Sequence, residues 1–320
     1  MRVAAGEEDS DPQNISMIIS IKSLLKQFWR SSLYHKLIYV VPIVYIVLIS
    51  AYMLWHRAWF SPDQFFAFAI FITMIIGRAK QFLRDWIPIL LLLFGYEYLR
   101  GVIPILAIKP HIMPMIYADK YLFGSLPTLD LQAALFHPNR SHWYDYVAVL
   151  LYISHFIVPM FVAFVLWLSD KRYFKRFTAS FLVLSYLAFI TFVIFPAMPP
   201  WMASNLGYLP PLQKIMDQVM ASFAHPIDVP SIYQFFGADL VAAVPSLHAA
   251  YPWLIFLIVA AKIGKKAAII LPYVFGVWFA VVYLGEHYVV DVIMGIMYAS
   301  LAFLIIRYAE KKQFKLALKS

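Results

Sequence analysis

The sequence contains no cysteine and very little charge for its length. The absence of cysteine excludes disulfide bonds, thiolate nucleophiles and zinc sites with thiolate ligands, and it leaves the redox compartment open. Asp, Glu, Lys and Arg together make up 13% of the 320 residues, whereas a soluble domain has about 25%. So little charge cannot cover the surface of a water-soluble fold of this size.

Long hydrophobic runs fill most of the chain. Hydrophobic residues make up 63% of it, against about 45–50% in a soluble domain. The runs are continuous, whereas strands of a membrane barrel alternate over about ten residues, and a helix needs about 20 residues to cross a membrane. We therefore predict an all-α polytopic membrane protein with about eight transmembrane helices, over residues 37–55, 64–77, 86–107, 145–168, 177–197, 240–261, 267–284 and 287–307. The short second segment could instead be re-entrant.

Positive charge is concentrated in every second connection between these segments. Lys and Arg cluster before residue 37, at 78–84, 171–176 and 262–266, and after residue 306, whereas the long connection 198–239 holds only Lys214. The positive-inside rule then places both termini in the cytoplasm. The net charge of +9 is therefore interpreted as loop charge, and no nucleic-acid partner is expected.

The chain divides into one membrane domain with two polar ends. Residues 1–36 are predicted to be a disordered or amphipathic cytoplasmic N-terminus, because the first 16 residues are polar and acidic and lack the apolar core of a signal peptide. Residues 37–307 are expected to form a single membrane domain that carries any active site. Residues 308–320 are expected to form a basic cytoplasmic tail.

Two short stretches place histidines at the start of apolar segments: AAVPSLH, ending at His248, and GEHYVVD, which contains His287 and Asp291. The histidines are 39 positions apart. This spacing corresponds to one helix that crosses the membrane, a basic turn and a second helix that crosses back. Such a hairpin brings both histidines to one depth near the extracytoplasmic surface. His287 and Asp291 are four apart and share a helix face, so the carboxylate can fix the imidazole tautomer.

The residues before His248 suit the start of a helix. Pro245 is expected at the first helical position, where no amide hydrogen is needed, and the amides of Ser246, Leu247 and His248 would then face an anion such as phosphate. Two histidines, a carboxylate and this helix end could transfer a phosphoryl group without a metal or cofactor. The alternative is that these polar groups are packed structural partners of their neighbours.

The PSLH and HYVVD elements resemble the type 2 phosphatidic acid phosphatase superfamily, whose pattern is KxxxxxxRP, PSGH and SRxxxxxHxxxD. This chain departs from that pattern in three ways: it has no Arg-Pro dipeptide, Val281 stands six positions before His287, and Leu247 replaces the glycine. These departures, together with FPAMPPW at 195–201, resemble the inositol phosphorylceramide synthase branch. The FPAMPPW stretch is expected to end a helix and shape the outer loop.

The resemblance implies a six-helix core over about residues 84–307, preceded by two further helices. It also implies roles for the three polar residues: His287 as the nucleophile that forms a phosphohistidine, Asp291 as the residue that orients it, and His248 as the general acid. The substrates would be a phospholipid donor and a lipid alcohol acceptor at the extracytoplasmic or lumenal side.

Substrate-binding residues are predicted on the same outer side. Arg100 lies 14 residues after Trp86, about 21 Å along a helix, where it could bind phosphate or pair with Glu97. Asp119 and Lys120 lie in the amphipathic outer loop 108–144, as binding residues or as solvated charges. Ser246 could donate to the phosphate or cap its helix. His155 is expected to be a buried core histidine. Trp201 is expected to be an interfacial tryptophan, with contact to a lipid headgroup as the alternative.

Three functions remain open at this stage. The first is a lipid phosphotransferase that moves a headgroup such as phosphoinositol to an acceptor such as ceramide. The second is a phosphatase that uses water to cleave a lipid phosphate or a polyprenyl diphosphate. The missing arginines favour the first, because a phosphodiester carries less charge than a phosphomonoester. The third is a non-catalytic lipid transport or assembly protein, which the intact histidine and aspartate set disfavours.

Overall fold

The structure is a computed structural model that describes residues 33–56, 62–103, 109–222 and 241–317. Across these ranges the regular elements are α-helices and a 3-10 helix, joined by isolated parallel bridges from His111 to Ala197 and from Ala197 to Ala242. The prediction of an all-α fold is confirmed. Most of the predicted N-terminal tail, residues 1–32, lies outside the described residues.

Each predicted apolar segment coincides with a long helix. These helices are α2 (Leu33–His56), α3 (Pro62–Ile75), α4 (Ala79–Val102), α7 (Trp143–Ser169), α8 (Lys171–Ile194), α11 (Leu247–Ile263), α12 (Leu271–Tyr283), which follows the 3-10 helix η3 (Gly264–Ile270), and α13 (Val289–Ala317). Several boundaries differ from the prediction. Helix α4 begins seven residues before position 86, and α8 begins six residues before position 177. Helix α11 begins seven residues after position 240, and α13 continues past position 307 to Ala317. The first ten residues of the predicted tail are therefore helical.

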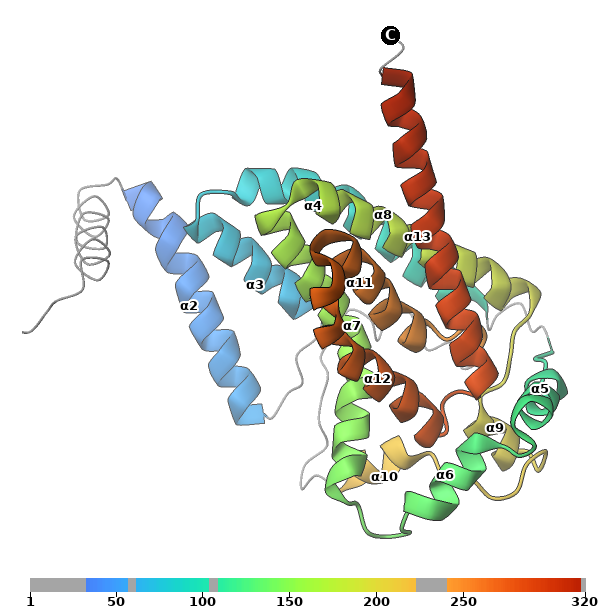
Figure 1. The fold of residues 1–320 in the computed structure, drawn as a ribbon. Helices are drawn as coiled ribbons and strands as arrows, with labels where there is room; N and C mark the ends of the chain where they lie inside the picture. The colour runs from blue at the N-terminus through green and yellow to red at the C-terminus, as the bar shows by residue number, and fades with distance from the viewer. Residues whose placement is uncertain (1–32, 57–61, 104–108, 223–240, 318–320) are drawn as a thin grey trace, which may run out of the picture.

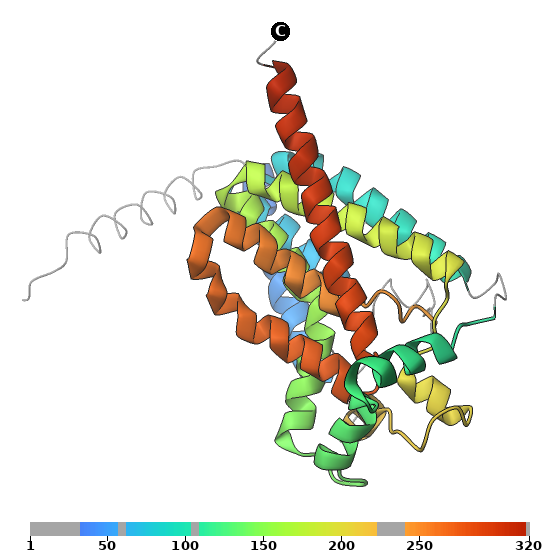
Figure 2. The same ribbon diagram turned by 45° about the vertical axis from the view of Figure 1, so that its right-hand side comes forward.

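Short helices gather at the end of the bundle opposite to the C-terminus (Figure 1). They are α5 (Met113–Phe123), α6 (Pro127–Leu135), α9 (Pro200–Asn205) and α10 (Ile215–Ala221). Figure 2 shows the same separation from a second direction, with the C-terminal part of α13 projecting away from them. FPAMPPW follows α8 and opens α9, as predicted, since Pro200 provides the first helical residue.

Helix α11 occupies the centre of the bundle, in contact with α7, α8, α12 and α13. Its closest neighbour is α13, and the approach depends on Gly295: a Cβ at that position would clash with the backbone carbonyl oxygen of Ser246. Small residues at such crossings matter because helices inside a membrane associate through close van der Waals packing rather than by exclusion of water. This crossing brings the PSLH and HYVVD elements together.

In the part of the chain that the structure describes, two helices are long and apolar enough to cross a membrane by themselves, Lys171–Ile194 and Val289–Phe314. A third span results if Trp143–His155 and Ile157–Ser169, bent by 51°, count as one. Pro159 explains a break there, because proline has no N–H for the carbonyl four residues earlier. The apolar helices and their packing indicate a membrane protein, whereas the predicted number of eight crossings stays a prediction.

Candidate active site

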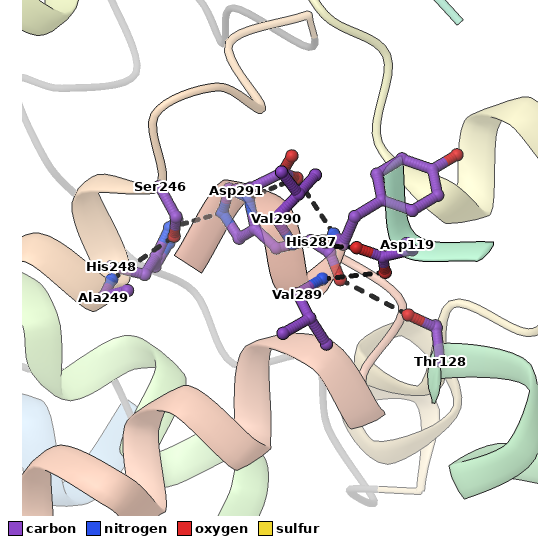
Figure 3. A network of polar contacts seen from close by, with 10 residues as sticks. Asp119, Thr128, Ser246, His248, Ala249, His287, Val289, Val290 and Asp291 are labelled. Atoms are coloured by element: carbon purple, nitrogen blue, oxygen red, sulfur yellow. Dashed lines mark hydrogen bonds and ion pairs between the residues drawn. The ribbon is translucent and has the colours of Figure 1, made fainter. Parts of the chain in front are cut away.

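The histidines at 248 and 287 and the aspartate at 291 form a continuous relay. His248 Nδ1 lies 3.1 Å from His287 Nε2, and His287 Nδ1 lies 3.4 Å from Asp291 Oδ2. Figure 3 shows the three residues meeting where the start of α11 faces the start of α13. If His287 donates Nδ1–H to the carboxylate, its Nε2 keeps a lone pair that faces His248.

The carboxylate is buried and held in place. Asp291 has no exposed surface, and its Oδ2 also accepts a hydrogen bond from the backbone N–H of Tyr288 at 2.9 Å. Its other oxygen, Oδ1, has no hydrogen-bond partner among the described residues. One detail of the prediction was wrong: His287 precedes α13, which begins at Val289, rather than lying on it. The four-residue spacing still aligns the two side chains across the first turn.

The start of α11 differs from the predicted open anion site. The N-cap is Ser246 and the helix begins at Leu247, so Pro245 lies outside the helix instead of at its first position. The Ser246 hydroxyl oxygen accepts from the N–H of Ala249 at 3.3 Å, and the Ser246 N–H donates to the Asp291 carbonyl oxygen at 3.0 Å. The serine therefore acts as a cap, and its amide is already bonded and cannot also bind a phosphate.

A cavity of about 360 Å³ opens in front of the two histidines. One part of its wall is apolar, with side chains from α4, α8 and α11 that include Leu93, Phe181 and Leu247. The remaining wall is polar and includes Arg100, His155, Lys214, Glu286, His248 and His287. An apolar and a charged wall meeting at a histidine pair suit a phospholipid, whose tails and phosphate need different surroundings.

Arg100 makes the pair that was one of the two alternatives left open by its sequence position. Its guanidinium makes bonds of 3.0 and 2.8 Å to one carboxylate oxygen of Glu97. Arg100 also lines the cavity together with His248 and His287. Its role in binding phosphate stays a prediction.

Asp119 and Lys120 lie away from the cavity wall. Asp119 is fully buried, and its two oxygens accept from the backbone N–H groups of Val289 and Val290 at 3.0 and 2.8 Å (Figure 3). Asp119, which lies on α5, therefore caps the start of α13. Burial raises the pKa of its carboxyl above the ordinary value of 3.8. Lys120, the next residue on α5, is exposed. The structure thus gives Asp119 a positioning role behind His287 and brings neither residue to the cavity.

His155 is buried, as expected for a core histidine. Its Nδ1 lies 2.6 Å from the backbone carbonyl oxygen of Tyr152. Its ring lies beside that of His248, with centroids 3.7 Å apart, and Tyr152 stacks on His248 at 4.2 Å. Together Tyr152 and His155 fix the orientation of the His248 ring from the side of α7.

Two charged residues of the cavity wall were not predicted to act on substrate: Glu286 and Lys214. Glu286 was visible in GEHYVVD, directly before His287, and Lys214 was the single lysine of the long outer connection. Sequence spacing gave no reason to join them, because α9 and α10 approach the start of α13 only in the folded protein.

The turn that carries Glu286 and His287 is tightly held. Gly285 has φ +82, and a Cβ there would lie 2.6 Å from a methyl group of Leu212. The Gln132 side chain donates to the carbonyl oxygens of Gln213 at 2.8 Å and of Tyr283 at 3.0 Å, which joins α6, the α10 loop and this turn. Within the described ranges, no cluster of three or more His, Asp or Glu side chains could hold a metal ion.

Comparison with known proteins agrees with this geometry. The sequence profile of the PAP2 superfamily, the type 2 phosphatidic acid phosphatases, matches residues 127–305, which include the whole histidine and aspartate relay. The chain belongs to the PAP2 superfamily. It is also 29% identical over 237 residues to a phosphoinositol dihydroceramide synthase of Bacteroides thetaiotaomicron, an alignment that covers 71% of this chain and 77% of that protein. No solved structure matches the chain significantly. The predicted superfamily and its inositol phosphorylceramide synthase-like branch are thereby confirmed.

Proposed function

We propose that this PAP2 protein is a lipid phosphotransferase. It would move a phosphate-containing headgroup, phosphoinositol in the first instance, from a phospholipid to the hydroxyl group of a lipid acceptor such as ceramide. The observation that carries the proposal is the His248–His287–Asp291 relay at the wall of a cavity that is apolar on one side and charged on the other. The name of the Bacteroides relative supports the choice of headgroup and acceptor.

The first step is attack on the donor. His287 Nε2 forms a bond to phosphorus while the bond from phosphorus to the diacylglycerol oxygen breaks, which leaves a phosphohistidine that carries the headgroup. The 3.1 Å contact between the rings must open to admit the phosphate. His248 transfers its proton to the departing alkoxide, and Asp291 stabilises the positive charge that develops on His287.

The second step reverses these roles. His248, now without its proton, accepts the proton of the acceptor hydroxyl, whose oxygen attacks phosphorus as the bond to His287 Nε2 breaks. Both steps need a cation beside the phosphate oxygens, and Arg100 is the cavity residue that supplies it best, because its partner Glu97 fixes its position. A phosphodiester carries a single negative charge, which suits a site without the further arginines of the phosphatases.

The active site is proposed to face the extracytoplasmic or lumenal side. Residues at the short helices α9 and α10, Trp201 and Met216 among them, line the cavity. These helices lie at one end of the bundle, and the basic end of α13 lies at the other (Figure 1). By the positive-inside rule that basic end belongs in the cytoplasm. Accessibility labelling of cysteines introduced at Ser125 and Lys315 in intact cells or sealed vesicles tests this orientation, since the chain has no cysteine of its own.

Headgroup transfer by the purified protein tests the function. Phosphatidylinositol with a labelled headgroup is incubated with and without ceramide, next to the His248→Ala and His287→Ala variants. Label appearing on the ceramide, and lost in both variants, supports the transferase. Release of free phosphate from phosphatidic acid or a polyprenyl diphosphate, without any transfer to ceramide, would instead establish the phosphatase, the runner-up. A folded His287→Ala protein that keeps full biological activity would favour the non-catalytic transport role.

A further inference from the structure

Glu286 is a charged residue that the mechanism above does not use. It lies between the Gly285 turn and the nucleophile His287, and it lines the same cavity. Its Oε1 is buried and has no hydrogen-bond partner among the described residues. A buried polar atom without a partner has lost its hydrogen bonds to water, so a ligand that donates a hydrogen bond there gains in affinity.

Two further residues define the surroundings of this carboxylate. Lys214 Nζ lies 4.7 Å from the ring centroid of Trp201, and both residues line the cavity with Glu286. Lys214 Nζ also lies 3.4 Å from Asp217 Oδ1, on the solvent side. Burial raises the pKa of the Glu286 carboxyl, while the positive charge of Lys214 and a hydrogen bond with the Trp201 side chain act in the opposite direction. The site thus combines an acceptor, a donor and an aromatic surface.

This combination discriminates between classes of headgroup. A carboxylate only accepts hydrogen bonds and an ammonium group only donates them, so a group that does both, such as a hydroxyl, can satisfy the pair. A quaternary or primary ammonium headgroup would be attracted by Glu286 but would need the face of Trp201, which Lys214 already occupies. The positive charge of Lys214 would also repel an ammonium headgroup at this site.

We propose that Glu286 and Lys214 form a headgroup subsite that selects a neutral polyol, such as an inositol ring, over cationic headgroups. This inference rests on the proposed transferase function and names the residues that set its donor specificity. Glu286 directly precedes His287, so its carboxylate can bind the headgroup while His287 attacks the phosphorus atom that carries this headgroup. The residue that selects the headgroup therefore lies beside the residue that attacks the phosphorus.

The backbone around the subsite is rigid enough to support selection. The N–H of Trp201 donates to the carbonyl oxygen of Gly285 at 3.0 Å, which connects α9 directly to the turn that carries Glu286. The Gln132 side chain accepts from the N–H of Gln213 at 3.0 Å, one residue before Lys214. Both charged residues are therefore held by the same network that positions His287.

The first test compares donors in the full-length protein. Headgroup transfer to ceramide from phosphatidylinositol and from phosphatidylcholine is measured for the wild type, Glu286→Ala, Glu286→Gln and Lys214→Met. The change Asp130→Ala is the matched control, because this acidic residue of α6 is exposed and does not line the cavity. We expect Glu286→Ala to reduce kcat/KM for phosphatidylinositol about tenfold or more, the size of one lost charge-assisted hydrogen bond, with a change of under about threefold for phosphatidylcholine. Equal losses on both donors would overturn the subsite.

The second test separates this inference from the function on which it rests. Thermal stabilisation of the detergent-solubilised protein is measured with glycerophosphoinositol and with glycerophosphocholine, which need no catalysis. Selective stabilisation by glycerophosphoinositol in the wild type, lost in Glu286→Ala and kept in Asp130→Ala, supports the subsite even if no transfer occurs with any acceptor. Equal stabilisation by both compounds, none by either, or an unchanged preference in Glu286→Ala overturns it, even if transfer is observed.

Discussion

The backbone N–H of Ser246 donates a hydrogen bond to the backbone carbonyl oxygen of Asp291 at 3.0 Å. This contact joins the first residue before α11 to the first turn of α13 through main-chain atoms alone. It places the two sequence elements, 39 residues apart at their histidines, in a fixed register. The spacing of the catalytic side chains therefore depends on how closely the two helices approach.

That approach is expected to fail when Gly295 is replaced. A Cβ at Gly295 would clash with the Ser246 carbonyl oxygen, which belongs to the backbone and cannot rotate away. We predict that Gly295→Ala lowers transfer activity by about 10²-fold, the loss associated with a displacement of about 1 Å in an active site. Gly276→Ala is the control, since the nearest atom, at 3.1 Å, belongs to the flexible side chain of Leu151. Similar activities of the two purified variants would show that the close approach does not set the register.

The relay predicts different roles for its two histidines. Without His287 no phosphohistidine can form, so His287→Ala should incorporate no label from a phosphate-labelled donor. His248→Ala keeps the nucleophile but loses the acid and base, and its turnover should fall about 10²–10⁴-fold. Acid-labile label on the protein after rapid quenching measures the first effect, and steady-state transfer measures the second. His137→Ala replaces an exposed histidine that follows α6, and this variant should match the wild type in both measurements. Normal labelling of His287→Ala would assign the nucleophile elsewhere.

The periodic features of this fold were predictable from local sequence. Each apolar run became a helix, because the need to satisfy backbone hydrogen bonds leaves few alternatives in an apolar medium. The meeting of His248 with His287 followed from counting one hairpin of helices, and the His287–Asp291 contact followed from their four-residue spacing. Both inferences use only the geometry of a helical hairpin and the spacing of residues along a helix.

The features that depend on contacts between distant segments were not predictable in this way. Asp119 was assigned to the outer loop, but its capping of Val289 and Val290 joins residues about 170 positions apart. Pro245 has the sequence signature of a first helical residue, yet the side chain of Ser246 caps the helix after it. Glu286 and Lys214 line one cavity only because α9 and α10 pack against the start of α13. For Asp119, Glu286 and Lys214 a contact between distant segments decided the role. The Ser246 cap is local, and it was one of the two roles that the sequence left open.

Asp119 is expected to contribute to stability through the helix that follows His287. Replacing Asp119 with Ala removes two hydrogen bonds from a buried carboxylate to backbone N–H groups, which we expect to cost about 1–3 kcal/mol. Asp119→Asn keeps one acceptor oxygen and should lose less. The unfolding temperature is measured in detergent, with gel filtration as the readout. The control is Lys120→Ala, at the exposed neighbour of Asp119 on α5. Equal unfolding temperatures for Asp119→Ala and Lys120→Ala would contradict the capping role.

Glu286 predicts a pH dependence of stability with a definite sign. Burial raises the pKa of its carboxyl in the folded protein above the ordinary value of 4.5. The unfolded chain therefore loses this proton at lower pH, and the contribution of Glu286 to stability falls as pH rises through the unfolded and then the folded pKa. Glu286→Gln cannot ionise, so it should unfold at a higher temperature than the wild type near pH 7 and at the same temperature near pH 4. Glu310→Gln is the opposing control, because it breaks an ion pair with the buried Arg176 and should lower the unfolding temperature near pH 7. If the wild type is instead more stable than Glu286→Gln at pH 7, the protein itself supplies the hydrogen-bond donor to the Glu286 carboxylate. The role that we assign to the substrate hydroxyls would then be wrong.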